Sequence, residues 1–303
     1  MTTLTVRAGD GVGLHVQRSG AGGTPVVFLH EFAGDARSWE PQVRKLGLRH
    51  HCVAYNARGY PPSDVPAEVG SYGQARAVDD LVAVLDGLGI DSAHLVGLSM
   101  GGFAALHAAL DHPDRCRSIV VAGVGYGAQP EHRALFAREA EATAAAFLDD
   151  HARAAERYAG GPTRVQLLRR NPRAFAELRA GLVEHSALGS ANTMRAVQAR
   201  RPSLYDLRER LAEVRVPTLL VVGDEDDGCL ETNLMLKRTM PAAGLAVMPR
   251  TGHTCNLEDA DAFTAQVSDF LATVEAGAWD LRDPRSVNRG LVGMGADGDG
   301  PTR

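Results

Sequence analysis

The chain has 303 residues, of which 45% are hydrophobic and 23% charged, a balance typical of a globular protein with a sizeable core. Its formal net charge of −5 is too small to favour nucleic acid or a membrane surface as a partner. No uninterrupted apolar run approaches the length of a membrane span, and residues 1–7 lack the basic start and apolar stretch of a secretory signal.

The four cysteines are far apart in the sequence and form neither a C-x-x-C pair nor a metal-ligand cluster. They are Cys52, Cys116, Cys229 and Cys255. Together with the missing secretory signal, this spacing predicts reduced thiols in a cytoplasmic protein that has no metal site.

Short apolar runs alternate with helical patterns along most of the chain. Alternating polar and apolar residues at 3–7 and 14–17 predict an antiparallel hairpin at a sheet edge. Continuous apolar runs, typical of strands buried on both faces, occur at residues 25–30, 51–55, 93–96, 119–123, 217–223 and 244–248. Helical patterns occur at residues 78–88, 103–110, 231–239 and 259–275. This alternation predicts an α/β fold with a mostly parallel sheet covered on both faces.

Residues 127–213 interrupt the alternation with long stretches that are rich in alanine and arginine and poor in β-branched residues. Three prolines divide them into several short helices: Pro162, Pro172 and Pro202. We therefore expect an all-helical insertion between two parts of one α/β core, residues 1–126 and 214–276. The glycine-rich residues 277–303 are expected to form a loosely ordered tail.

The motif Gly97-Leu98-Ser99-Met100-Gly101 lies between an apolar run and a helical run. A G-x-S-x-G motif in this context predicts a nucleophile elbow, a sharp turn that projects the serine hydroxyl from the end of a strand. Side chains at Gly97 and Gly101 would collide with the neighbouring backbone. The following helix points its N-terminal N–H groups at the serine, where they favour a developing anion. Ser99 is thus a candidate nucleophile, although a tight turn with an ordinary serine would carry the same motif.

Two further groups of polar residues follow apolar runs. The acidic cluster 224–227 follows the run at 217–223, and His253 follows the run at 244–248. Parallel α/β sheets carry their chemistry at the carboxyl ends of the strands. These side chains are therefore expected to lie at the same sheet edge as Ser99.

In these motifs and in their order, serine then acid then histidine, the sequence resembles the α/β-hydrolase fold enzymes of the esterase and lactonase type. The matching segments are His30-Glu31-Phe32-Ala33-Gly34, Gly97-Leu98-Ser99-Met100-Gly101-Gly102, Gly223-Asp224-Glu225-Asp226 and Gly252-His253. The resemblance covers about residues 3–275. It implies a Ser-His-acid triad, and it places the helical insertion at the position of that family's lid, or cap domain.

Chemistry and the resemblance together assign the roles in this triad. A serine hydroxyl needs a base within hydrogen-bond reach, and His253 follows a strand in the required order. It would take the proton from Ser99, while an acid orients the imidazole and stabilises its cation. The family pattern G-x-x-D implies Asp226 as this acid, with Asp224 and Asp227 as alternatives.

An oxyanion hole needs two backbone N–H donors. One belongs to Met100, which follows the candidate nucleophile, and the resemblance implies that Phe32 supplies the other. The family usually has glycine where this chain has Glu31, and glycine tolerates backbone angles that glutamate resists. Glu31 would either point to solvent or a nearby arginine, or face the site and modulate His253 or position water. An unchanged pH–rate profile in Glu31→Gln would rule out the second alternative.

Several other side chains have simpler structural explanations. His30, also a candidate modulator, is expected to brace the oxyanion loop rather than move protons, and His107 to be packed or capped in a helix. Arg58 is expected to anchor a turn, and Cys255 to act as a small buried hydrophobe. Most arginines of the insertion, although able to attract an anionic substrate, are expected on a solvated helical face: Arg164, Arg169, Arg170, Arg173 and Arg179.

The favoured activity is that of a serine hydrolase that cleaves a small or medium carboxylic ester or lactone through an acyl-enzyme. The same triad could instead cleave a carbon–carbon bond, or carry out perhydrolysis or acyl transfer. A third alternative is a non-catalytic ligand-binding protein of this fold, since fold analogy alone does not settle function. Without a glycine-rich phosphate loop or a metal triad, we expect no cofactor and a small ester or lactone as partner. The sequence leaves open whether the chain forms a homodimer.

Overall fold

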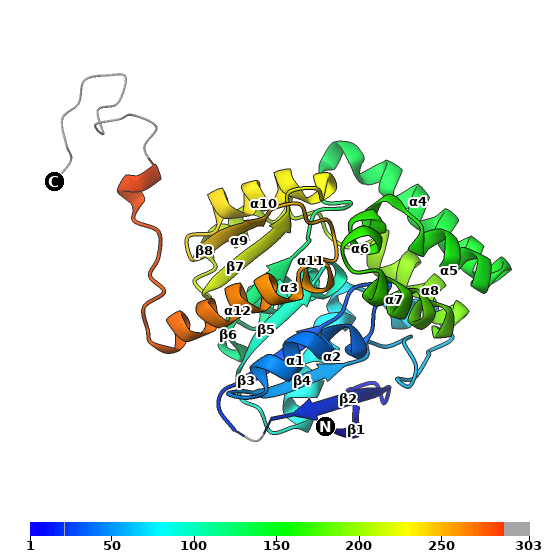
Figure 1. Cartoon of the computed structure of the whole chain (residues 1–303), viewed down its shortest axis with the longest axis horizontal. Coiled ribbons are helices and arrows are strands. Elements are labelled where there is room, and N and C mark those ends of the chain that lie inside the picture. The colour runs from blue at the N-terminus through cyan, green and yellow to red at the C-terminus, as the bar shows by residue number, and fades with distance from the viewer. Residues whose placement is uncertain (21, 288–303) are drawn as a thin grey trace.

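An eight-stranded sheet organises the protein (Figure 1). The computed structural model describes residues 1–20 and 22–287. The strands lie in the order β1-β2-β4-β3-β5-β6-β7-β8. Their bounds are β1 (Thr2–Arg7), β2 (Gly13–Ser19), β3 (Pro25–Leu29), β4 (His51–Tyr55), β5 (Ala93–Leu98), β6 (Cys116–Ala122), β7 (Thr218–Gly223) and β8 (Ala243–Met248).

The predicted strands and their directions are confirmed. β1 and β2 form an antiparallel hairpin at one edge, and β2 also pairs antiparallel with β4. All other neighbouring strands pair in parallel. Within β3, Val26 and Phe28 belong to the hydrophobic cluster on one face, and Val27 and Leu29 to the cluster on the other. In β3 to β7 both faces are largely buried, which is why these runs are continuously apolar rather than alternating. The expected burial of the run at 244–248 on both faces is wrong, because β8 is the edge strand of the sheet and Val247 is 48% exposed.

Helices cover both faces of the sheet, as predicted (Figure 1). The apolar side chains of α1 (Glu40–Leu46) and α12 (Ala260–Glu275) pack on one face. Those of α2 (Gln74–Gly87), α3 (Met100–Asp111) and α10 (Asp227–Thr239) pack on the other. Two shorter helices also pack on the core: α11 (Cys255–Glu258), and α9 (Arg208–Glu213) from the end of the segment between β6 and β7.

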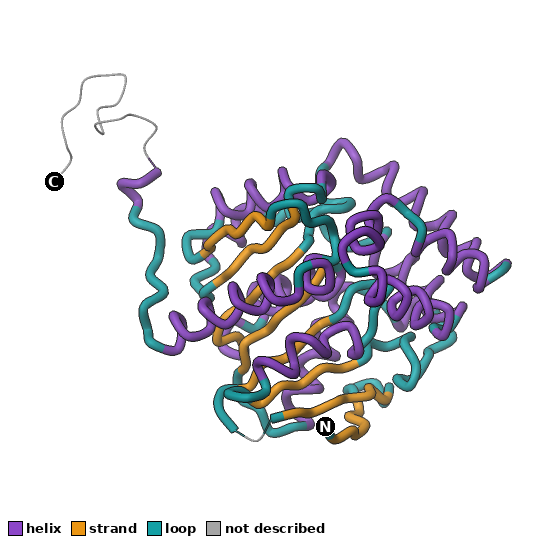
Figure 2. Tube along the Cα trace, in the orientation of Figure 1, coloured by secondary structure: helices purple, strands orange, loops and turns teal. Residues whose placement is uncertain are grey.

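Between β6 and β7 the described residues 123–217 form helices and loops only (Figure 2). We refer to residues 127–213 as the helical insertion. Before α9 it contains α4 (Pro130–Asp149), α5 (His151–Ala159), α6 (Val165–Arg170), α7 (Pro172–Glu184), α8 (Ala187–Asn192) and a π-helical turn (Thr193–Gln198). Most of its buried apolar side chains share one hydrophobic cluster with Phe32, Met100 and Leu257, which follow β3, β5 and β8, while Ala128, Leu204 and Leu211 pack in the core. The insertion therefore packs on loops at the carboxyl ends of the parallel strands.

The chain beyond α12 returns to the core. The Trp279 indole packs edge-on against Phe270, with ring centroids 4.6 Å apart, and its Nε1 donates to the carbonyl of Ala242 at 2.8 Å. The predicted loose tail, residues 277–303, thus begins with a residue docked on α12 and β8, and residues 288–303 lie outside the described residues. None of the described helices is long and apolar enough to cross a membrane.

His107 of α3 is packed in the core, as predicted, and this burial makes stability depend on pH. Burial lowers the pKa of its imidazole from 6.5 to about 4. Between these pH values the unfolded chain binds a proton that the folded chain does not. The free energy of unfolding is therefore expected to fall on acidification from about pH 6.5 to pH 4, by up to roughly 1.4 kcal/mol per pH unit for this group.

Urea unfolding of wild type and His107→Gln at pH 7, 5.5 and 4.5 measures this dependence. The free energy of unfolding of the variant is expected to depend less steeply on pH than that of wild type. Part of the dependence remains, because burial also lowers the pKa of His94 in β5 to about 4. His132→Gln, at an exposed position of α4, serves as the control and should retain the wild-type slope. Identical slopes in His107→Gln and wild type would contradict the prediction.

Candidate active site

The turn after β5 holds Ser99 in a strained backbone conformation. Its φ of 51° and ψ of −113° lie in a region that residues with a side chain rarely adopt. Its N–H donates to the carbonyl of Ala122 at 2.8 Å, and α3 begins at the next residue, Met100. A buried strand and a buried helix thus fix the turn from both sides, and the positive end of the helix dipole lies at Ser99.

Close backbone contacts explain the two glycines of the motif. A Cβ at Gly97 would lie 2.2 Å from the carbonyl oxygen of Gly101. A Cβ at Gly101 would lie 2.0 Å from the carbonyl oxygen of Leu29 in β3. Both atoms belong to regular backbone that cannot shift without disturbing β3 or α3. The turn that carries Ser99 therefore requires glycine at both positions, as the sequence predicts.

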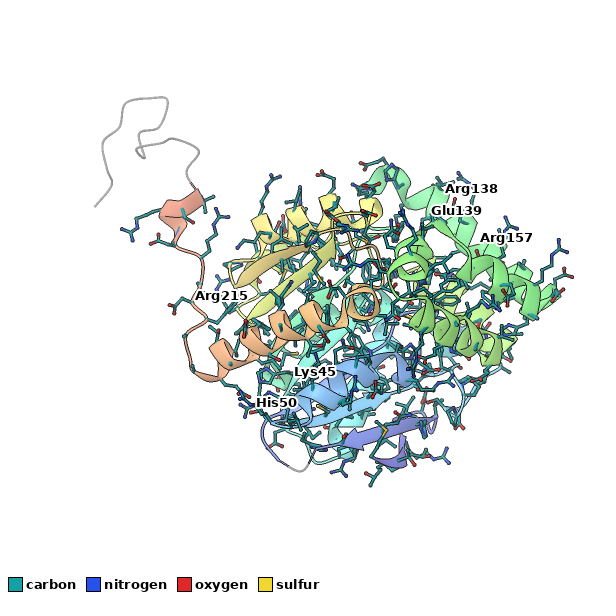
Figure 3. The ribbon with its side chains drawn as sticks, viewed as in Figure 1. Lys45, His50, Arg138, Glu139, Arg157 and Arg215 are labelled. Carbon is teal, nitrogen blue, oxygen red and sulfur yellow. The ribbon has the colours of Figure 1, made fainter. Side chains whose placement is uncertain are left out.

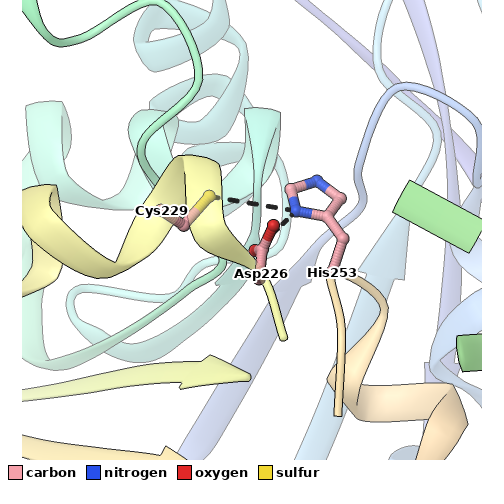
Figure 4. Close-up of side chains that lie close together, drawn as sticks. All are labelled: Asp226, Cys229 and His253. Atoms are coloured by element: carbon pink, nitrogen blue, oxygen red, sulfur yellow. Dashed lines mark hydrogen bonds and ion pairs between the residues drawn. The ribbon is translucent and has the colours of Figure 1, made fainter. Parts of the chain in front are cut away.

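His253, in the turn after β8, is hydrogen-bonded to Asp226, in the turn after β7 (Figure 4). Its Nδ1 lies 2.9 Å from Oδ2 of Asp226, and both side chains are buried. The second ring nitrogen points away from the carboxylate in Figure 4. The alternative acids, Asp224 and Asp227, are exposed. Of these three acids, all within the described residues, only Asp226 is bonded to His253.

Opposing effects set the pKa of Asp226. Burial by itself would raise this pKa, but the charge of the His253 imidazole and the hydrogen bond to it hold the pKa below its ordinary value. Cys229 and Tyr126 act in the same direction as His253. Tyr126 also packs edge-on against the imidazole, with ring centroids 5.4 Å apart. Asp226 is therefore ionised at neutral pH and able to stabilise a protonated His253.

Asp226, Cys229 and His253 also present a carboxylate oxygen, a thiol and an imidazole nitrogen within 4.8 Å of one another. The sulfur of Cys229 lies 4.0 Å from Nδ1 of His253 (Figure 4). Burial raises the pKa of the Cys229 thiol well above its ordinary value, which disfavours the thiolate that a metal ligand requires. The same Nδ1 already bonds Asp226. The group thus fits a histidine with its orienting acid better than a metal centre.

Ser99 and His253 line one cavity of about 530 Å³. This volume lies in the range of small-molecule binding sites. The core contributes Phe32 and Tyr126 to its wall. The helical insertion contributes Phe136, Ala140, Tyr158, Met194, Gln198 and Arg201, among others. A ligand in this cavity would therefore contact the core loops and the insertion at the same time.

His30 holds the loop after β3 in place. Its Nδ1 lies 2.7 Å from the carbonyl oxygen of Glu31, and its Nε2 accepts the N–H of Ala57 at 3.0 Å. Because Nε2 accepts a hydrogen bond, the proton of the neutral ring resides on Nδ1. Burial lowers the pKa of the His30 imidazole, which favours this neutral form. These contacts fit a brace. They fix the loop that carries Phe32. The Phe32 ring packs on Tyr158 of α5, with ring centroids 5.1 Å apart.

Glu31 forms a buried ion pair with the helical insertion. Its Oε2 accepts from Nη2 of Arg164 at 2.5 Å, and the two side chains are only 2% and 1% exposed. The predicted solvent-facing Glu31 is therefore wrong, and its predicted arginine partner is present. The predicted solvated face is wrong for Arg164, which can be buried because this carboxylate compensates its charge. Arg173 of α7, in contrast, has a side chain that is 90% exposed.

Arg58 and Cys255 have the structural surroundings that were predicted. Nε and Nη2 of Arg58 form a bidentate pair with the carboxylate of Asp80 at 2.7 and 2.6 Å, and Nη1 contacts Asp10 at 2.9 Å. Cys255 is fully buried at the start of α11, and burial raises the pKa of its thiol. These contacts account for both residues without a catalytic role.

Sequence reasoning did not single out most residues of the cavity wall, among them Tyr126 and Arg201. Tyr126 follows β6, and its place after a parallel strand is a signal that could have found it. Arg201 lies three residues after the π-helical turn, beside a second arginine, Arg200. Nothing in that segment of sequence distinguishes a buried arginine from a solvated one, so only tertiary packing places Arg201 in the cavity.

Comparison with known proteins identifies the family. The model of the alpha/beta hydrolase fold matches residues 24–259, which is more than half of the chain. The chain therefore belongs to the α/β-hydrolase fold family, as its motifs implied.

Several relatives are similar along nearly the whole chain. The 2-hydroxy-6-oxo-6-phenylhexa-2,4-dienoate hydrolase of Burkholderia cepacia is 31% identical over 281 residues, covering 86% of this chain and 91% of the relative. The 3-oxoadipate enol-lactonase 1 of Acinetobacter baylyi is 27% identical over 275 residues, covering 88% and 96%. The crystal structure of the enol-lactonase from Burkholderia xenovorans LB400 superposes with a TM-score of 0.77 at 25% identity, covering 89% and 100%. These relatives are hydrolases of different bonds, which supports an enzyme of this family and leaves its reaction to be inferred from its own site.

Proposed function

We propose that this protein is a serine hydrolase that cleaves a small or medium carboxylic ester or lactone with Ser99, His253 and Asp226 as its catalytic triad. One observation carries the proposal. The strained Ser99 shares a cavity with His253, whose Nδ1 is hydrogen-bonded to the buried Asp226. Strain at a functional side chain, a base on the same cavity and an acid behind that base are what nucleophilic catalysis requires.

The reaction would proceed through an acyl-enzyme in two steps. First, Oγ of Ser99 bonds to the carbonyl carbon of the substrate while its proton passes to Nε2 of His253. The tetrahedral intermediate then collapses, the bond to the leaving oxygen breaks, and that oxygen takes the proton from Nε2. In the second step water attacks the acyl group and gives its proton to Nε2, which returns it to Oγ as the carboxylic acid leaves. Asp226 holds the imidazole and stabilises its transient positive charge.

The backbone N–H groups of Met100 and Phe32 would form the oxyanion hole. Met100 is the first residue of α3, where N–H groups have no acceptor within the helix. Phe32 lies in the loop that His30 and the Glu31–Arg164 pair hold against the core and the insertion. Donors fixed in this way stabilise a developing oxyanion at little reorganisation cost.

The helical insertion would act as the lid of the site. Its helices α4 and α5 supply part of the cavity wall, and Phe32 packs against Tyr158 at the junction. A cover of this kind excludes water and shapes specificity. Two relatives of this chain are enol-lactonases, which favours a lactone among the substrates.

Hydrolysis of a carbon–carbon bond is the second candidate. It is favoured by the dienoate hydrolase of Burkholderia cepacia, which is 31% identical to this chain. The same serine, base and acid would serve, with a carbon leaving group in place of oxygen. Cleavage of a β-diketone-like substrate would distinguish this activity from that of an esterase, because such a substrate has no ester bond.

Labelling by a fluorophosphonate probe tests the proposal directly, with Ser99→Ala as its control. We expect wild type to be labelled at Ser99 and to hydrolyse members of a panel of p-nitrophenyl esters and lactones. Labelling without turnover on this panel, combined with cleavage of a β-diketone, would favour the carbon–carbon hydrolase. A folded wild type that is neither labelled nor active on any substrate would overturn the proposal in favour of a non-catalytic binding protein.

A further inference from the structure

Arg201 is a buried cation in the wall of the proposed catalytic cavity. It lines the same cavity as Ser99 and His253, and it is 3% exposed. Its guanidinium stacks on Phe103, with the central carbon 3.8 Å from the ring centroid. Phe136 of α4 lies on the same guanidinium, at 5.3 Å. Aromatic contacts of this kind hold the side chain in place without neutralising its charge.

The polar contacts of Arg201 do not neutralise it either. Nη1 donates to the side-chain oxygen of Gln198 at 2.5 Å, and Nη2 donates to the carbonyl of Tyr126. Both acceptors are uncharged. Among residues 1–20 and 22–287, no carboxylate lies within ion-pair distance of Arg201.

The other two buried arginines of the described chain each have a carboxylate partner, which Arg201 lacks. Arg58 is paired with Asp80 and Asp10, and Arg164 with Glu31. Burying a charge is costly unless an opposite charge compensates it, and both of these arginines follow that rule. Of these three buried arginines, only Arg201 lacks a compensating carboxylate, and it lies in the wall of the cavity that holds the candidate nucleophile.

The guanidinium keeps unused donors for a further acceptor. Arginine has five N–H groups, and the two protein acceptors engage two of them. Nε of Arg201 is buried and has no hydrogen-bond acceptor within the described residues. Burial lowers the pKa of Arg201 to about 9, so the group still carries its charge at neutral pH.

We propose that Arg201 binds a carboxylate group of the substrate, so that the preferred substrate is an anionic ester or lactone. This inference rests on the proposed hydrolase function, because it places the substrate in the cavity of Ser99. A carboxylate can accept two parallel N–H bonds from a guanidinium, which gives both affinity and orientation. The bound anion would supply the counter-charge that the protein itself does not.

The charges at the exposed rim of the cavity do not explain such a preference. Arg157 of α5 and Glu139 of α4 both line the cavity, both are exposed, and they carry opposite charges (Figure 3). Water and salt screen exposed charges strongly. Arg157 therefore provides a matched control, because it offers the same functional group on the same cavity without burial.

Two substrates of equal chain length test the proposal by turnover. They are 4-nitrophenyl hydrogen glutarate, which carries a terminal carboxylate, and neutral 4-nitrophenyl valerate. We expect wild type to prefer the anionic ester in kcat/KM by roughly 10- to 100-fold, the value of a hydrogen bond to a charged group. Arg201→Gln is expected to lose this preference, Arg201→Lys to keep part of it, and Arg157→Gln to keep it.

A binding measurement separates this inference from the proposed hydrolase function. In Ser99→Ala, calorimetric titration compares monomethyl glutarate with methyl valerate, with and without Arg201→Gln. If wild type hydrolyses neither ester but Ser99→Ala binds the anionic ligand through Arg201, the hydrolase proposal fails and anion binding by Arg201 stands. An equal loss of activity on both esters in Arg201→Gln would show a merely structural role and overturn the inference. So would an unchanged preference in that variant.

Discussion

Replacing Ser99 with alanine is expected to lower kcat for ester or lactone hydrolysis by about 10⁵- to 10⁶-fold, the usual cost of removing the nucleophile of a triad. In the proposed mechanism no acyl-enzyme can form without Oγ, and His253 and Asp226 would have no hydroxyl to activate. The residual rate would come from the oxyanion donors and from substrate binding, which together retain about 10³-fold over water. Steady-state kinetics on the best ester of the panel measures the loss.

A second serine provides the matched control. Ser92 lies just before the first residue of β5, whereas Ser99 follows the last, so the two serines lie at opposite ends of one strand. Ser92→Ala is expected to keep kcat within a factor of about two, since the half-buried Ser92 lies at the end of β5 away from the cavity and carries none of the features that make substitutions costly. A Ser99→Ala variant that folds normally and loses less than tenfold would exclude Ser99 as the nucleophile.

Replacing Glu31 with glutamine is expected to lower the free energy of unfolding by about 3–5 kcal/mol. Glutamine cannot balance the charge of Arg164, which is 1% exposed and would then be a buried cation without a counter-charge. Its Nε already has no hydrogen-bond acceptor among the described residues. Urea unfolding at pH 7 measures the change, and the midpoint is expected to shift without a large change in slope.

A double variant distinguishes loss of the ion pair from loss of packing. Replacing both partners, as Glu31→Gln with Arg164→Met, removes the uncompensated charge and is expected to recover most of the lost stability. Glu177→Gln is the control, because Glu177 pairs with Arg173 on the surface of α7, with side chains 63% and 90% exposed. It should cost less than about 1 kcal/mol. A Glu31→Gln variant no less stable than Glu177→Gln would contradict the prediction.

The same Glu31→Gln variant tests whether Glu31 modulates the site. The ion pair orients the carboxylate towards Arg164 in the insertion, and it joins the insertion to the loop that carries Phe32. If Glu31 acts only as this link, kcat will fall together with stability while the shape of the pH–rate profile stays unchanged. A shifted profile would assign to Glu31 an influence on His253.

Local patterns were sufficient to predict most of the fold. Period-2 and continuous apolar runs mark strands because a pleated strand places successive side chains on opposite faces, and both faces are covered here. The helix predicted at 231–239 proved to begin at Asp227, directly after the catalytic candidate Asp226. Two α-helices outside the insertion were not predicted, α1 and α11, with seven and four residues. Helices this short show too few turns for a periodic signal.

The candidate triad was also predictable, for reasons that act locally. Ser99 needs glycine two residues away on either side because the backbone of the turn approaches both positions within contact distance. The acids at 224–227 and His253 follow predicted strands, and parallel strands end at one sheet edge. The choice of Asp226 over Asp224 and Asp227 rested on the family pattern, and burial beside His253 supports it.

The sequence by itself determined the α/β class, the order in which a serine, an acidic cluster and a histidine follow predicted strands, and the candidate nucleophile and base, because each of these rests on a motif or an apolar run of neighbouring residues. Only the tertiary structure decided the partners of buried charges. Glu31 and Arg164 are 133 positions apart, and a single sequence carries no sign that they meet. The burial of Arg201 could not be predicted from the sequence either. An arginine is normally solvated, and only packing against Phe103 and Phe136 removes this one from water. Long-range burial, which no local pattern encodes, thus determines whether a charge is neutralised by the protein or left for a ligand.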